Sequence, residues 1–145
     1  MGEDPSIFTM IIQGEIPCHK VYEDDLIFAF LDINPSSPGH TLVVPKEPAR
    51  TLDELSEDSA QAIGRALPRI SKAVLDATGA SEFNVIQNNG PKAFQSVFHV
   101  HFHIIPKMED GRGLSFPFNP SPIDHEDGAG LSSSIRDLLS GPSSQ

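Results

Sequence analysis

The chain has 145 residues, of which 10 are Lys or Arg and 20 are Asp or Glu, and its formal net charge is -10. This length supports one hydrophobic core, and the acidic balance argues against nucleic-acid polymers and anionic membrane surfaces as partners, because both attract basic surfaces. No apolar run approaches the roughly 20 residues of a membrane span, and the acidic N-terminus lacks the basic region of a secretory signal. The lone Cys18 cannot form an internal disulfide. We therefore expect a single cytoplasmic domain over residues 1–145.

The first third of the chain predicts a short helix followed by three strands. Apolar side chains recur at helical spacing over residues 7–12, and Gly14 ends this pattern. Strands are expected over residues 21–23, 26–31 and 40–44, with turn residues between them. The second of these strands is apolar throughout, which predicts that both of its faces are buried.

The long helical pattern of the chain occupies residues 51–79. Small and apolar side chains recur there at helical spacing, as on a helix that faces the core. Ser56 can cap the first turn and Gly79 can end the last one. Pro68 lies inside the pattern and predicts a kink around residues 64–68.

The remaining chain predicts two more strands, a loop and a closing helix. The strands are expected over residues 83–87 and 96–105. From Glu109 the composition changes to Gly, Pro, Ser and Asp, which favours a surface loop over residues 109–130. Leucines and an isoleucine at helical spacing then indicate a short helix over residues 131–140.

Three histidines stand at alternate positions in the strand expected over residues 96–105. Side chains on a strand alternate between faces, so His99, His101 and His103 would share one face, with neighbours about 6.6–6.8 Å apart along the strand. The apolar residues between them would anchor the other face on the core. Three aligned imidazoles pack a core poorly, so this pattern indicates a chemical role.

Two kinds of chemistry fit the three histidines. A His-x-His pair could ligate a transition metal, but the outer pair spans roughly 13 Å of strand, so all three cannot converge on one ion. Alternatively, the central imidazole could attack phosphorus, because an imidazole with a pKa of about 6.5 is largely neutral at neutral pH. Its neighbours would then orient it and hold the phosphate.

Together with its surroundings, the histidine pattern resembles the Hint-type branch of the histidine-triad (HIT) superfamily. The resemblance covers residues 5–108 and, more loosely, the closing helix. It rests on segments in the family's order: Ile7–Pro17, Val21–Asp25, Phe30–Pro35, Pro38–Lys46, Asn88–Gly90 and His99–Ile105. It implies an α+β fold with an antiparallel sheet of about five strands, one long helix and a short N-terminal helix, in a homodimer.

The resemblance also implies an activity. Such enzymes cleave the P–N or P–O bond of purine nucleoside 5′-phosphoramidates, or of related AMP and GMP conjugates, and release the nucleoside monophosphate without a cofactor. The reaction passes through a covalent nucleotidyl-histidine. Two alternatives stay open: a dinucleoside polyphosphate hydrolase of another HIT branch, and a purine-nucleotide sensor or scaffold with incidental activity.

The resemblance assigns a role to each catalytic residue. His101 would be the nucleophile, with His99 and His103 at its sides. His40 would be the upstream histidine that orients the triad. Ser96 would contact the leaving amine.

Nucleotide binding is assigned in the same way. Asp32 would bind the ribose hydroxyls, because a carboxylate can accept from both hydroxyls of a diol. The other residues expected to contact the nucleotide are Asn88, Phe94 and Gln95 near the phosphate, and Ile7, Phe8, Ile11, Phe30 and Ile33 around the base. Packing in the core is an alternative explanation for the last five.

The chain departs from the family pattern at three places, one of which is Pro68 inside the long helix. Ser6 and Thr9 stand where many bacterial relatives have the cysteines of a structural zinc site. Hydroxyls are weaker zinc ligands than thiolates, so we predict no metal. Phe94 stands where the family usually has Gly, which predicts a changed backbone approach to the phosphate.

Overall fold

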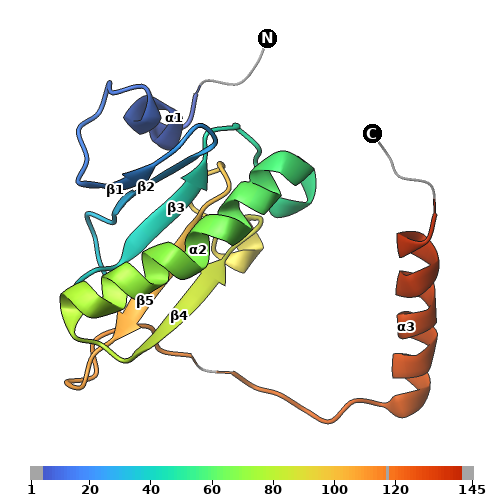
Figure 1. Ribbon diagram of the computed structural model, residues 1–145. Coiled ribbons are helices and arrows are strands. Elements are labelled where there is room, and N and C mark those ends of the chain that lie inside the picture. The colour runs from blue at the N-terminus through green and yellow to red at the C-terminus, as the bar shows by residue number, and fades with distance from the viewer. Residues whose placement is uncertain (1–4, 117, 142–145) are drawn as a thin grey trace. The chain divides into compact units, whose positions relative to one another are not determined.

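The computed structural model describes residues 5–116 and 118–141 and confirms the predicted α+β architecture (Figure 1). One antiparallel sheet has the strand order β1-β2-β3-β5-β4. Its strands are β1 Lys20–Glu23, β2 Ile27–Leu31, β3 Thr41–Pro45, β4 Glu82–Gln87 and β5 Phe102–Lys107. The helices are α1 Ile7–Ile12, α2 Glu57–Thr78 and α3 His125–Leu139, with short 3-10 turns at Leu52–Glu54 and Pro91–Ala93.

The chain divides into two compact units, one ending at Ser115 and one starting at Phe116. The first unit holds the whole sheet with α1 and α2, and the second holds α3. Within the described ranges, no helix is long and apolar enough to cross a membrane.

Strand β2 lies between two apolar cores, which confirms that both of its faces are buried. Ile27 and Ala29 point to the core formed with α2. Phe28 and Phe30 point to the opposite core, formed with α1. Figure 1 shows α2 crossing one face of the sheet. The alternation of side chains along one strand therefore ties both helices to the sheet.

Helix α2 begins and ends where the sequence predicts. The Ser56 hydroxyl accepts a hydrogen bond from the Ser59 N–H at 3.2 Å, and Gly79 ends the helix with a φ of 78°. Glycine adopts this positive φ without the steric cost that a Cβ atom would bring. The helix runs continuously through Pro68.

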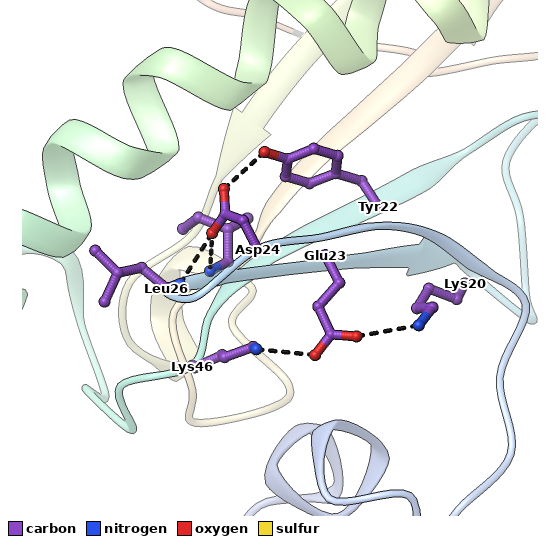
Figure 2. A network of polar contacts seen from close by, with 7 residues as sticks. Lys20, Tyr22, Glu23, Asp24, Leu26 and Lys46 are labelled. Atoms are coloured by element: carbon purple, nitrogen blue, oxygen red, sulfur yellow. Dashed lines mark hydrogen bonds and ion pairs between the residues drawn. The ribbon is translucent and has the colours of Figure 1, made fainter.

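The turn between β1 and β2 is fixed by one carboxylate (Figure 2). Asp24 accepts from the N–H groups of Leu26 and Ile27, both at 2.9 Å, and from the Tyr22 hydroxyl at 2.7 Å. These bonds hold the start of β2, and its far end delivers Asp32 to the site described below.

The strand predicted over residues 96–105 is wrong at its start, because β5 begins at Phe102. Before this residue the chain turns away from β3. The His99 ring bonds to the Pro45 carbonyl, and the Val100 N–H bonds to the Ala49 carbonyl at 2.9 Å. His99 and His101 therefore precede the strand, and the three histidines do not form one strand face.

The predicted boundary between a loop over 109–130 and a helix over 131–140 is also wrong. Helix α3 starts at His125, six residues before the predicted start. Asp124 caps it, because its side chain accepts from the N–H groups of Glu126 and Asp127 at 3.0 Å. This cap outweighs the low helix propensity of the glycines that follow.

Candidate active site

A cleft of about 370 Å³ is lined by residues of α1, β2, β3 and β5. It brings together nine of the predicted site residues: Ile7, Phe8, Ile11, Phe30, Asp32, Ile33, Ser96, His101 and His103. Phe8, Ile11 and Phe30 also belong to the core between α1 and the sheet. Ile33 is 79% exposed, at the mouth of the cleft. The cleft thus has apolar walls, one carboxylate and two imidazoles.

His101 is held in one orientation by the backbone and by an aromatic ring. Its Nδ1 lies 2.7 Å from the carbonyl oxygen of His99. A carbonyl only accepts, so Nδ1 carries the proton and Nε2 carries the lone pair. The Phe8 ring packs edge-on against the imidazole, with centroids 4.9 Å apart. The ring that lines the cleft therefore offers a nucleophilic nitrogen.

His99 is buried, and both of its ring nitrogens are hydrogen-bonded. Its Nε2 donates to the Pro45 carbonyl at 2.8 Å. Its Nδ1 then accepts from the Ser6 hydroxyl at 3.0 Å, with Thr9 Oγ1 at 3.4 Å. The ring is 1% exposed, so its backbone carbonyl is a rigid acceptor for His101.

His40 and His103 form a relay with fixed proton positions. The Ser36 N–H donates to His40 Nδ1 at 3.0 Å, so His40 Nε2 carries the proton. That proton points to His103 Nδ1 at 2.9 Å, with Asp32 Oδ2 at 3.5 Å. His103 therefore carries its own proton on Nε2. His103 lines the cleft as a hydrogen-bond donor, beside the His101 ring at a centroid distance of 4.9 Å.

All four imidazoles are neutral at neutral pH. Burial lowers the pKa of His40, His99 and His101 below the usual value, against weaker opposing contacts from Asp32 and backbone carbonyls. For His103, burial together with the neighbouring His101 and His40 lowers the pKa to about 4. Burial disfavours the charged imidazolium, which keeps the lone pair of His101 available.

The residues best placed to hold a metal ion are Asp32, His40 and His103, whose ligand atoms all lie within 4.8 Å of one another. Hydrogen bonding accounts for this proximity, because the His40 Nε2 proton lies between the other two atoms. These three residues form the hydrogen-bonded relay described above.

Three of the residues predicted to bind the nucleotide do not line the cleft. Gln95 is buried, and its amide bonds to Gly90, Arg50 and Val97. Phe94 is 86% exposed and adopts a left-handed conformation with a φ of 70°. Asn88 is half-buried at the end of β4. Gln95 thus shapes the loop that carries Ser96, and Phe94 occupies a conformation that glycine adopts freely.

Sequence reasoning missed the residues that orient the histidines. Ser6 and Thr9 were considered only as poor zinc ligands, yet both hydroxyls contact His99. Ser6 is the N-cap of α1, and its place directly before the first helical residue is a signal that could have found it. Ser36 acts through its backbone N–H, for which side-chain identity gives no signal.

The sequence and the fold are similar to those of known proteins of one family. A family model described as the HIT domain matches residues 13–110. An adenosine 5′-monophosphoramidase of Schizosaccharomyces pombe is 47% identical over 122 residues, which cover 81% of this chain and 89% of that protein. An adenylylsulfatase of Arabidopsis thaliana is 45% identical over 107 residues, or 74% of this chain and 54% of that protein. A crystal structure of a HIT family member from Bacillus subtilis is 40% identical with a TM-score of 0.88, and the match covers 97% of this chain and 100% of that one.

Proposed function

The chain belongs to the HIT domain family, and we propose from this premise that it hydrolyses purine nucleoside 5′-phosphoramidates through a covalent nucleotidyl-histidine intermediate. The observation that carries the proposal is the hydrogen bond from His101 Nδ1 to the His99 carbonyl. It leaves Nε2 as the lone-pair nitrogen of a neutral ring that lines the cleft. The relatives named for phosphoramidate and adenylylsulfate cleavage support a nucleotide substrate.

In the first step His101 Nε2 attacks phosphorus. A P–N bond to His101 forms as the P–N bond to the amine breaks, and the amine nitrogen keeps that electron pair and takes a proton from solvent. The His103 Nε2–H donates to a phosphate oxygen, and the Ser96 hydroxyl donates to the departing nitrogen. The positive charge that develops on His101 is stabilised at Nδ1–H by the His99 carbonyl.

In the second step water attacks the phosphorus of the nucleotidyl-histidine. The P–N bond to His101 breaks, Nε2 regains its lone pair, and the nucleoside monophosphate leaves while one proton passes to solvent. Asp32 binds the ribose hydroxyls, and the apolar walls from α1 and β2 enclose the base. Phe30 and Ile11 therefore serve both the core and the base pocket.

A single-turnover assay with adenosine 5′-phosphoramidate tests this mechanism. Wild-type protein is expected to release AMP and, after an alkaline quench, to carry an acid-labile nucleotidyl adduct. His101→Ala is expected to lose turnover by about a thousandfold or more, because His103, the other imidazole in the cleft lining, carries a proton on Nε2 and has its Nδ1 bonded to His40. The matched control is His19→Ala, at an exposed position that does not line the cleft. Tight AMP binding without turnover by wild type would favour the nucleotide sensor, and full turnover by His101→Ala would refute the nucleophile.

We further propose that two copies pair through β4. This strand ends the sheet, and its Phe83 and Val85 are 38% and 43% exposed beside Leu67 and Leu75 of α2. An edge strand with an apolar flank invites a second strand of the same kind. Sedimentation of Val85→Glu is expected to show a monomer. A control on the opposite edge strand, Val21→Glu, is expected to keep the wild-type mass, and an unchanged mass in Val85→Glu would contradict the pairing.

A further inference from the structure

The carboxylate of Asp32 faces two N–H groups of the protein itself. Its Oδ1 accepts from the Asn34 N–H at 2.8 Å. Its Oδ2 lies 3.5 Å from His40 Nε2, the nitrogen that carries the proton of this ring. The backbone brings the two side chains together, because the Asp32 N–H donates to the His40 carbonyl at 2.9 Å. Asp32 therefore contacts the His40–His103 relay as well as lining the cleft.

Only a carboxylate can serve both N–H groups and a ribose at the same time. The two N–H groups face different oxygens of Asp32, and an amide of the same shape has a single acceptor oxygen. A carboxylate has about four lone-pair positions, so the contacts inside the protein leave others for the hydroxyls of a ribose. The Asp32 side chain is 20% exposed and lines the cleft, so a bound nucleotide can reach it.

The position of the carboxylate reinforces one direction of the relay. The Ser36 N–H donates to His40 Nδ1, so the proton of His40 lies on Nε2. Asp32 Oδ2 faces that same Nε2, where a carboxylate attracts a proton and repels a lone pair. The Nε2–H of His40 donates to His103 Nδ1 at 2.9 Å. Asp32 thus favours the state in which His103 carries its proton on Nε2, toward the cleft.

The charge of Asp32 also acts on the rings that line the cleft. Burial lowers the pKa of His40, His101 and His103. The Asp32 carboxylate opposes this lowering at all three rings, because it stabilises a positive charge on each of them. Attack on phosphorus by His101 develops such a charge. The same carboxylate therefore favours the attacking step.

We propose that Asp32 is a positioning residue for the His40–His103 relay, in addition to its contact with the ribose. The inference rests on the proposed phosphoramidase activity and adds a second role to one residue of that site. Because the relay contact needs no substrate hydroxyl, loss of the carboxylate lowers kcat even for a nucleotide without ribose hydroxyls. A residue that acted through the ribose alone would leave that kcat unchanged.

The kinetic test combines Asp32→Asn with the 5′-phosphoramidates of adenosine and of 2′,3′-dideoxyadenosine. Asparagine can still accept from the Asn34 N–H, but it then turns an N–H donor toward His40. Asp32→Asn is expected to lower kcat for the dideoxy substrate by about tenfold, the lower end of the effect of a hydrogen bond to a charged group. An unchanged kcat for this substrate would overturn the proposal while the activity stands. The matched control is Asp25→Asn, at an exposed position outside the cleft, which should leave kcat unchanged.

Heteronuclear NMR of the imidazole rings tests the positioning without turnover. In the free wild-type protein, His40 and His103 are each expected in one tautomer with the proton on Nε2. The amide N–H of Asp32→Asn favours a lone pair on His40 Nε2 and the proton of His103 on Nδ1, so signals of this second tautomer are expected. Signals unchanged from wild type would overturn the positioning role, even where no substrate is cleaved. If Asp32→Asn does not fold, Asp32→Ser repeats the kinetic comparison, since its hydroxyl can still accept from the Asn34 N–H.

Discussion

The strained residue in the loop that carries Ser96 gives a sharp prediction for stability. Phe94 has a φ of 70° and a ψ of 22°, a left-handed conformation that costs an L-residue about 1–2 kcal/mol. The loop cannot relax it easily, because Gln95 bonds to Gly90 through both its backbone N–H at 3.0 Å and its side chain at 2.7 Å. The ring itself is 86% exposed and contributes little apolar burial.

Phe94→Gly is therefore expected to stabilise the protein. Glycine removes the strain, which stabilises the folded protein by about 1–2 kcal/mol. Its greater conformational freedom in the unfolded chain destabilises the folded protein by about 0.4–1 kcal/mol. The net gain is about 1 kcal/mol, which for a chain of this size raises Tm by about 2–4 °C.

Urea unfolding and a thermal melt of both proteins measure this gain. Phe94→Ala is the control, because it removes the ring and keeps the strain, so its free energy of unfolding should stay within about 0.5 kcal/mol of wild type. A Phe94→Gly variant that is less stable than wild type would show that the ring, and not the backbone, determines the energy at this position.

Three further predictions concern the histidines. Burial lowers the pKa of His101, so kcat/KM for adenosine 5′-phosphoramidate should be constant from about pH 8 to about pH 6.5 and should fall only at lower pH. A pH–rate profile measures this, and an acid limb centred above about pH 6.5 would contradict the assignment of His101 as the nucleophile. The unfolded chain binds more protons than the folded one between the ordinary histidine pKa of about 6.5 and the lowered values, so the free energy of unfolding should fall as pH drops through this window. The loss of stability should continue toward about pH 4, the pKa of His103. A series of urea titrations in which the free energy of unfolding does not change with pH would refute this prediction. Ser6→Ala removes a helix cap and a hydrogen-bond donor to His99, so urea unfolding should show a free energy of unfolding lower by about 1–2 kcal/mol. An unchanged free energy of unfolding would contradict both roles of Ser6.

Much of the fold could be predicted because its signals are local. The caps of α2 are single residues, Ser56 and Gly79, and each acts within one helical turn. The burial of β2 could be predicted from its own apolar side chains, which alternate between the two cores. Composition alone gave no such signal for α3, where one capping carboxylate, Asp124, moved the start of the helix ahead of two glycines.

The parts that could not be predicted depend on partners distant in sequence. Strand β5 starts late because the carbonyls of Pro45 and Ala49 take the bonds that a longer strand would have used. Gln95 was expected near the phosphate, yet its amide is committed to the backbone of Gly90, Arg50 and Val97. Neither outcome is contained in the residues' own types or spacing.

The same reasoning explains why the spacing of the histidines identifies them but does not distinguish them. As residue types His99, His101 and His103 are equal, and each neutral imidazole has two possible tautomers. The hydrogen-bond partners decide between the tautomers. A carbonyl acceptor places the proton of His101 on Nδ1, and a carbonyl and a hydroxyl place that of His99 on Nε2. The Nε2–H of neutral His40 donates to His103 Nδ1 and so places the proton of His103 on Nε2. In the proposed mechanism His101 thereby acts as the nucleophile, His99 as a buried support and His103 as a donor to the cleft. For the two histidines that line the cleft, the deciding groups belong to the backbone: the His99 carbonyl acts directly on His101, and the Ser36 N–H acts on His103 through His40.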